Sequence, residues 1–244
     1  MNTLGDLVAR DRRSSALALC VPALGRDYSY RDFCTTAWKA GNFLSFLGVR
    51  GGGRVAIEPD PLPEPLLTFF GAALHGATTT FDPSDGDVRA VVVPERRESE
   101  FADVAGTKRV VYGGPPTDPA VSHWEKEVWS ENPAFPPTDV DPDTAALAVG
   151  DDNYSHRTLL DAADRVVADF ELTDADEVVV RASLADPGTV VAGVLAPLSV
   201  GATVVFPEPD DDDSQGTLAV TDADADVDDA CVPEDRLVGV STVL

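Results

Sequence analysis

Lysine is almost absent from this chain. Lys39, Lys108 and Lys126 are the only lysines among 244 residues, and 18 Lys plus Arg stand against 43 Asp plus Glu, which gives a formal net charge of −25. A surface this negative repels phosphates, which argues against nucleic acid as a partner. Acidic surfaces poor in lysine suit multimolar salt, where the Debye length falls to about 3 Å or less and self-repulsion is screened.

We therefore expect a protein from the cytoplasm of a salt-accumulating halophile. An ordinary acidic protein with a basic partner is the alternative interpretation of the same composition. The halophilic interpretation is favoured because the acidic residues are spread over the chain instead of being gathered in one tail. Hydrophobic residues make up 43% of the sequence, too many for a disordered chain, so the charge is expected on a folded surface.

Cysteine and long apolar runs are also scarce. Cys20, Cys34 and Cys231 are odd in number and widely separated, which argues against a disulfide framework or a zinc site and favours free or buried thiols in a reducing compartment. No apolar run approaches the roughly 20 residues of a membrane span. Residues 1–13 also lack the apolar stretch of a signal peptide. The sequence thus predicts a cytoplasmic protein that does not enter membranes, and it predicts no metal site.

The chain contains an internal repeat. Tyr28-Ser29-Tyr30-Arg31 recurs as Tyr154-Ser155-His156-Arg157, and the apolar residues that follow keep helical spacing in both copies. Ser29 and Ser155 are each placed to cap the start of a helix. Five further pairs of segments recur in the same order, namely strands 54–57 and 178–181, helices 66–76 and 191–201, strands 77–81 and 202–206, strands 90–93 and 217–220, and strands 109–112 and 236–239.

Valine-rich strands that alternate with helices predict parallel sheets covered by helices. We therefore expect an α/β fold of two similar parallel-sheet lobes that arose by duplication, related by a pseudo-twofold axis within one compact unit. The first lobe is predicted to span residues 1–137 and the second residues 138–244. The Pro-rich stretch 132–137 is the natural connection between them.

With these elements in place, the sequence resembles the N-terminal domain of AMP-forming acyl-CoA synthetases, which are adenylate-forming ligases. The resemblance implies a large domain of two similar α/β lobes. It rests on segments of both halves, which are Tyr28–Phe33, Gly48–Ile57, Pro63–Leu67, Phe69–Pro83, Asp143–Leu147, Gly193–Leu198 and Gly201–Val205.

The resemblance also implies where ATP should bind, and the residues there do not suit it. Members of the family hold ATP with a Ser/Thr/Gly-rich loop that ends in Pro-Lys-Gly, because backbone amides, hydroxyls and a cation are needed around phosphates. Here the predicted strand 145–149 runs into Gly150-Asp151-Asp152-Asn153, with two carboxylates and no Ser, Thr or Lys. Its shortness predicts a tight turn between two strands.

Other ligase elements have no counterpart up to Leu244. Where the family often has an aromatic-plus-histidine segment, this chain has Leu184–Gly188. The downstream Tyr-Gly-x-Thr-Glu segment, the ribose-binding aspartate and the lysine-bearing C-terminal domain that the resemblance implies are not matched. Without phosphate clamps, adenylation lacks its main transition-state stabilisation. We therefore expect no catalytic residues in this chain.

Three functions stay open at this point. The first is a non-catalytic relative of the acyl-CoA synthetases that acts as a binding or regulatory module and needs no cofactor. The second is a shortened or split AMP-forming ligase subunit, which would use ATP, AMP or CoA. The third is an assembly protein that self-associates or joins a protein partner through the crevice between its lobes.

Only two residues stand out as ligand candidates. His156 and Arg157 open a predicted helix just after the shortened turn, where a helix N-terminus can hold an anion. The structural alternative is a surface pair at a helix start, which is favoured because Tyr30 and Arg31 occupy the equivalent place in the first lobe. The acidic runs Asp210–Asp213 and Asp222–Asp226 fit solvated loops better than calcium sites.

Overall fold

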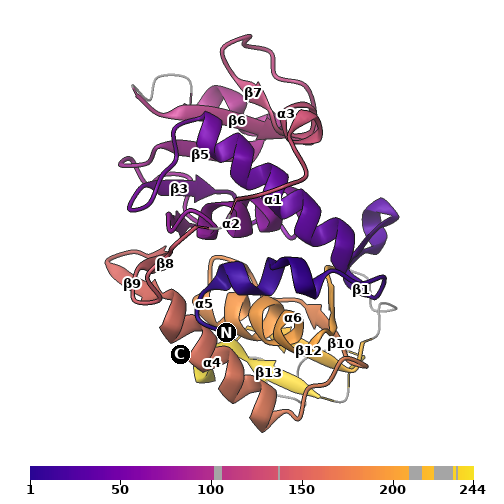
Figure 1. Ribbon diagram of the computed structural model, residues 1–244. Helices are drawn as coiled ribbons and strands as arrows, with labels where there is room; N and C mark the ends of the chain where they lie inside the picture. The colour runs from indigo at the N-terminus through magenta and orange to yellow at the C-terminus, as the bar shows by residue number, and fades with distance from the viewer. Residues whose placement is uncertain (102–105, 137, 209–215, 223–232, 235) are drawn as a thin grey trace.

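The computed structural model describes residues 1–244 except 102–105, 137, 209–215, 223–232 and 235 (Figure 1). Within this described part, the strands form two sheets, one of seven and one of six strands. Helices lie along the sheets, so the α/β class predicted from the sequence is confirmed. All but one of the pairings within each sheet are parallel, and the exceptions are two hairpins.

The first sheet is built largely from the first half of the chain. In spatial order its strands are β7 (Ser122–His123), β6 (Lys108–Tyr112), β5 (Ala90–Pro94), β3 (Arg54–Ile57), β4 (Thr78–Thr80), β8 (Ala145–Val149) and β9 (Asp152–Ser155).

The second sheet is built largely from the second half. In spatial order its strands are β13 (Leu237–Gly239), β12 (Leu218–Thr221), β10 (Glu177–Val180), β11 (Thr203–Val205), β1 (Leu17–Val21) and β2 (Arg26–Ser29).

The two sheets have the same strand order, and each ends in a hairpin from the other half of the chain. The order β6-β5-β3-β4 corresponds to β13-β12-β10-β11, and the next position is taken by the β8–β9 hairpin in the first sheet and by the β1–β2 hairpin in the second. Leu19 of β1 pairs in parallel with Val204 of β11, and Leu147 of β8 pairs in parallel with Thr79 of β4. This shared topology is what an internal duplication predicts.

Sheet membership therefore does not follow the predicted division at residue 137. The hairpin 17–29 belongs to the sheet of the second lobe, and the hairpin 145–155 belongs to the sheet of the first. A strand pattern identifies a strand but not the sheet that it joins, because the partner is set by tertiary packing. One continuous hydrophobic core includes Leu19, Phe33, Leu147 and Val204, so it draws on both sheets and both hairpins.

The repeated helices form where the Ser caps predict them. Helix α1 (Tyr30–Phe46) starts after Ser29, whose Oγ accepts a hydrogen bond from the Asp32 N–H at 3.2 Å. Helix α4 (His156–Asp169) starts after Ser155, whose Oγ accepts one from the Thr158 N–H at 3.1 Å. Each hydroxyl satisfies a backbone N–H that the first helical turn leaves without an intrahelical partner.

The second pair of repeated helices differs from the prediction. Helix α2 spans Pro63–Ala73, three residues earlier than the predicted 66–76, because proline is well accommodated in the first turn of a helix. Its counterpart is interrupted: α5 (Pro187–Thr189) leads into a π-helical segment (Val190–Leu195) and then α6 (Ala196–Val200). Pro197 has no N–H to donate in the regular i→i−4 pattern, which explains a wider turn at this point.

Shorter elements complete the described part of the chain. They are α3 (Trp124–Ser130) and the 3₁₀ segments η1 (Leu4–Val8), η2 (Arg10–Arg12), η3 (Pro22–Leu24), η4 (Glu95–Phe101) and η6 (Val240–Thr242). The N-terminal segment with η1 lies between the upper and lower halves of the molecule in Figure 1. In that position η1 buries Leu4, Leu7 and Val8 in the shared core.

Candidate functional site

The turn between β8 and β9 occupies the place where the sequence resemblance puts the phosphate loop. Val149 pairs with Asp152 across the hairpin, so only Gly150 and Asp151 lie between the paired residues. Gly150 has φ +57°, a left-handed conformation that favours glycine. The predicted tight turn is confirmed. In the first half, the equivalent hairpin closes between Val21 and Arg26 and leaves room for residues 22–25.

This turn follows the carboxyl end of a strand that runs parallel to β4, the end where open α/β sheets bind their ligands. Asp151 and Asp152 are exposed there. Between β8 and β9 there is thus no run of free backbone amides, no hydroxyl and no cation, while two carboxylates face solvent. The turn cannot surround a phosphate group as the Ser/Thr/Gly-rich loop of the ligases would.

His156 does not lie on the surface, which contradicts the surface pair that the structural alternative predicted. It is fully buried, and its Nδ1 accepts a hydrogen bond from the Leu4 N–H at 3.2 Å. Burial lowers its pKa to about 4, with a smaller opposing effect of the Asp6 carboxylate. At neutral pH the imidazole is uncharged and its proton lies on Nε2, so it cannot attract an anion.

Arg157 is exposed, as the structural alternative expected, but its charge already has a partner. Its Nε donates to Asp143 Oδ1 at 2.7 Å and its Nη2 to Asp143 Oδ2 at 3.3 Å. These hydrogen bonds lower the pKa of the Asp143 carboxyl. The two residues named from the sequence therefore point in different directions, and the structure does not bring them together into one site.

His156 and Tyr30, which occupies the equivalent position in the first half, share a structural role. Tyr30, at the same position of α1, is buried, and its hydroxyl donates to the Ala202 carbonyl at 2.7 Å. His156 at the start of α4 accepts from Leu4. Each side chain thus connects the first repeated helix of one half to the backbone of the other half. This cross-connection could not be read from the sequence, because its partners lie 172 and 152 residues away.

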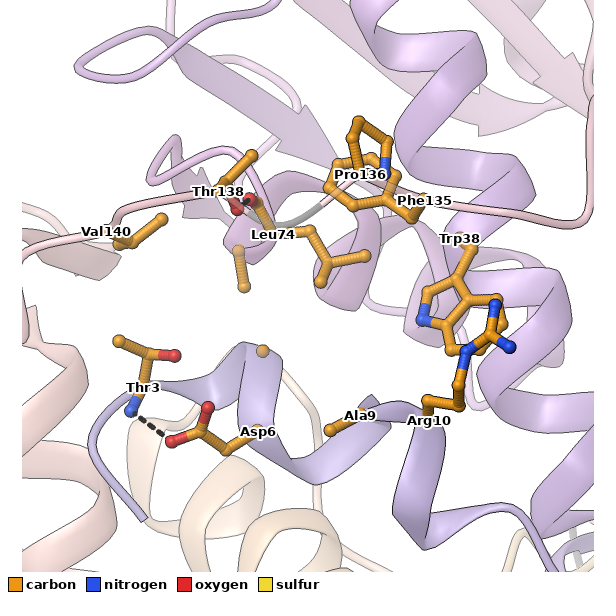
Figure 2. Close-up of a pocket in the computed structure, with 12 residues that line it drawn as sticks. Thr3, Asp6, Ala9, Arg10, Trp38, Leu74, Phe135, Pro136, Thr138 and Val140 are labelled. Atoms are coloured by element: carbon orange, nitrogen blue, oxygen red, sulfur yellow. Dashed lines mark hydrogen bonds between the residues drawn. The ribbon is translucent and has the colours of Figure 1, made fainter.

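A cavity of about 530 Å³ lies between the N-terminal segment and the first lobe (Figure 2). Thr3, Asp6, Ala9 and Arg10 lie on one side of it, opposite Trp38 of α1, the end of α2 and residues 135, 136, 138 and 140. Its walls are mostly apolar and include Trp38, Leu74, Phe135, Pro136 and Val140.

Two charged side chains enter this cavity. The Asp6 carboxylate accepts hydrogen bonds from the backbone N–H groups of Asn2 at 2.6 Å and Thr3 at 3.1 Å, the second of which is drawn in Figure 2. Arg10 forms no ion pair with any residue that the structure describes, so its guanidinium remains free to meet a ligand. Leu74 precedes β4 and Val140 precedes β8, which places the cavity toward the amino ends of these strands, away from the Gly150 turn.

Sequence reasoning missed this cavity. The only sign of it was the Pro-rich stretch 132–137, where Phe135 packs edge-to-face on His75 with ring centroids 5.0 Å apart. His75 Nε2 lies 2.8 Å from the Gly41 carbonyl, and burial lowers the pKa of this imidazole. These contacts fix the connection as a wall of the cavity.

Several other expectations concern thiols, metals and membranes. Cys34 is buried and Cys20 half-buried, and both are free thiols whose pKa is raised by burial to about 11. Cys231 and the run Asp210–Asp213 lie outside the described residues, as does the run Asp222–Asp226 apart from Asp222. Within the described ranges, no three His, Cys, Asp or Glu side chains group as metal ligands would. The helices described here are all too short or too polar to span a bilayer.

Comparisons with known proteins identify the fold. No family model and no curated protein sequence matches this chain. Among solved structures, the anthranilate CoA ligase AuaEII in complex with anthranoyl-AMP superposes with a TM-score of 0.79 at 18% identity, over 91% of this chain and 50% of the ligase. Apo MatB from Rhodopseudomonas palustris gives 0.76 at 17% identity, again over 91% and 50%.

A third likeness is to a long-chain-fatty-acid-CoA ligase, FadD1, from Archaeoglobus fulgidus, with a TM-score of 0.74 at 17% identity over 91% of this chain and 51% of that one. The fold is therefore that of the N-terminal domain of adenylate-forming ligases, and the resemblance predicted from the sequence is confirmed at the level of the fold. The chain spans about half the length of these ligases.

Proposed function

We propose that this chain is a non-catalytic relative of the AMP-forming acyl-CoA synthetases that acts as a binding or regulatory module. The observation that supports this most directly is the Val149–Asp152 pairing, which reduces the connection between β8 and β9 to Gly150 and Asp151. The proposal requires no catalytic residue, no cofactor and no metal.

The physical argument is electrostatic. Phosphoryl and adenylyl chemistry depends on amides and cations already arranged around the charges that develop in the transition state. At the Gly150 turn the charged groups are the carboxylates of Asp151 and Asp152, which repel a triphosphate. The nearest cation along the chain, Arg157, is held by Asp143. The turn would therefore raise the barrier to adenylation.

The cavity lined by Trp38 and Leu74 supports a role in binding. Its volume of about 530 Å³ falls within the roughly 300–1,000 Å³ of typical small-molecule sites. Its apolar walls favour a mostly apolar ligand, and Arg10, which has no ion-pair partner among the described residues, favours one that also carries a negative group. In this proposal the protein keeps the ligase fold as a scaffold and binds at the amino ends of the strands instead of reacting at the carboxyl ends.

Acid-dependent exchange of labelled pyrophosphate into ATP tests the proposal. The purified protein would be assayed in concentrated KCl with Mg²⁺, CoA and a panel of aliphatic and aromatic carboxylic acids, while circular dichroism confirms that it is folded. We expect no exchange above the rate without protein. Exchange that depends on both the protein and one of the acids would refute the non-catalytic assignment.

The alternative is a shortened or split AMP-forming ligase subunit that uses ATP, AMP or CoA with a second polypeptide. This chain matches about half of the length of each solved ligase, and a split ligase subunit would do the same. It differs in one measurable respect, because a ligase subunit must bind ATP once its partner is present. Binding of labelled ATP with and without a co-purified partner protein separates the two functions.

A further inference from the structure

A groove of about 310 Å³ lies on the outer face of the first lobe, remote from the Gly150 turn. It is bordered by α1, by α3 and by β2. Tyr28, Trp124 and Val128 supply an aromatic and aliphatic lining. Trp124 is itself fixed, because its Nε1 donates to the buried Thr68 hydroxyl at 2.8 Å. The groove therefore has an apolar part in which the Trp124 ring is fixed.

Trp129 stands at the rim of this groove and is held in place while almost wholly exposed. Its side chain is 83% exposed, a larger fraction than that of Phe46, Met1, Leu24 or Leu244, the other exposed large apolar residues of the described part. Lys39 Nζ donates to the Trp129 carbonyl at 2.9 Å and lies 5.3 Å from the centroid of the indole ring. Exposed, positioned tryptophans are the residues that most often dominate the binding energy of protein interfaces.

The groove is electrically balanced on a strongly acidic protein. Its charged lining residues are two cations, Arg26 and Lys39, and two carboxylates, Asp32 and Glu125, so their formal charges sum to zero. The whole chain carries −25. A second copy with the same net charge meets less repulsion here than across the average surface, and the two signs allow cation-to-carboxylate pairing between copies.

A protruding side chain beside a groove is self-complementary under a twofold axis. In a two-fold interface the same surface of both copies is used, and residue i of one meets residue j of the other in both directions. We propose that this chain forms a homodimer in which Trp129 of each copy inserts into the groove of the other, against Tyr28, Trp124 and Val128. This inference is independent of whether the chain binds a ligand or catalyses a reaction.

Salt dependence distinguishes this partner from a basic protein. Two copies of −25 repel one another in dilute buffer, and screening at about 1 M salt or more shortens the Debye length to roughly 3 Å. Dimerisation through an apolar contact should therefore strengthen as KCl is raised. Binding of a basic protein to the same acidic chain would weaken.

Sedimentation equilibrium at rising protein concentration in dilute and in concentrated KCl tests the proposal. We expect a dimer in concentrated KCl, with a dissociation constant at least about 30-fold higher for Trp129→Ala, as expected for a residue that dominates an interface. Thr36→Trp, which places a large side chain at a residue that lines the groove, should weaken the dimer similarly. Phe46→Ala is the matched control, because it removes an aromatic side chain that is 80% exposed on α1 but does not line the groove.

A wild-type chain that stays monomeric in concentrated KCl at the highest soluble concentration would overturn the proposal. So would a dimer that Trp129→Ala and Thr36→Trp leave unchanged, or one that Phe46→Ala weakens as much as Trp129→Ala does. The far-ultraviolet circular dichroism of each variant shows that the fold is kept.

Discussion

The imidazole of His156 and the backbone of Leu4 join the two halves of the molecule: Nδ1 accepts the Leu4 N–H at 3.2 Å inside the core. Leu4 opens the segment η1, which carries Asp6 and leads to Ala9 and Arg10 along one side of the cavity. A side chain at the start of α4 therefore fixes one wall of the proposed ligand site. This connection needs the imidazole to be neutral, because protonated Nδ1 cannot accept a hydrogen bond.

The stability of the fold should depend on pH through His156. Its pKa is lowered from 6.5 to about 4 on folding, so the unfolded chain binds the proton more tightly. The stabilisation is complete above pH 6.5 or so and is lost as the pH falls toward about 4. Between about pH 7.5 and about pH 5, the free energy of unfolding should fall by about 2 kcal/mol from this residue alone.

Urea unfolding of the wild type and of His156→Gln at both pH values isolates this contribution, since the glutamine oxygen can accept the Leu4 N–H but does not titrate. Between the two pH values the wild type should lose about 2 kcal/mol more than His156→Gln loses. An equal pH dependence in wild type and His156→Gln would contradict the prediction.

Each sheet contains a hairpin from the other half of the chain. A mutation in the core of one of these hairpins should therefore destabilise the sheet that the hairpin joins, not the sheet built from its own half of the sequence. Leu19 is fully buried and pairs with Val204, so Leu19→Ala should cost about 2–5 kcal/mol and lower the hydrogen-exchange protection of β11 amides more than that of β4 amides. Leu147→Ala should do the reverse, because Leu147 pairs with Thr79 of β4. If each mutation lowered hydrogen-exchange protection only in the sheet built from its own half of the sequence, the observed placement of the hairpins would be contradicted.

A buried and an exposed ion pair should differ in their effect on stability. Glu234 has a fully buried side chain and receives hydrogen bonds from Arg181 at 2.9 and 3.2 Å. Glu234→Ala removes a buried carboxylate together with both of these charge-assisted hydrogen bonds and should lower the free energy of unfolding by about 2 kcal/mol. Asp143→Ala, which removes the partner of exposed Arg157, should leave the free energy of unfolding nearly unchanged, because solvent and salt screen this pair. Similar costs for both variants, measured by urea unfolding, would refute this contrast.

The charge of −25 predicts that salt stabilises the protein. We propose that the chain is adapted to concentrated salt, and we expect its Tm to rise from about 0.1 M to about 3 M KCl as self-repulsion is screened. A variant with several exposed Asp residues of α4 changed to Asn, such as Asp161, Asp164 and Asp169, should gain less from salt. A Tm that is flat or falling with KCl in the wild type would contradict salt adaptation.

The sequence predicted the order of elements well because their signals are local. Strand β3 coincides with the predicted 54–57, and β10 at 177–180 lies one residue from the predicted 178–181. Helices α1 and α4 begin directly after their predicted Ser caps. Apolar spacing and cap residues act within a few positions along the chain, so a single sequence is enough to find them.

The rest depends on contacts between distant residues. Nothing in Leu17–Val21 says that it pairs with β11 and not with a strand of its own half. His156 follows a helix cap, where an exposed side chain is expected, but in the fold it is buried and receives a hydrogen bond from Leu4, 152 residues away. The cavity likewise forms where residues 3–10 approach Trp38, residues 73–74 and residues 135, 136, 138 and 140, and this approach is a property of the fold.

The measurement that tests the central claim most directly is isothermal titration of the protein with MgATP in concentrated KCl, alongside a variant in which Asp151 and Asp152 are both changed to Asn. We expect no saturable binding by the wild type up to millimolar ATP, because the Gly150 turn offers carboxylates where phosphates need amides and a cation. A wild-type dissociation constant in the micromolar range, altered by the paired Asn substitutions, would place ATP at this turn and contradict the non-catalytic assignment.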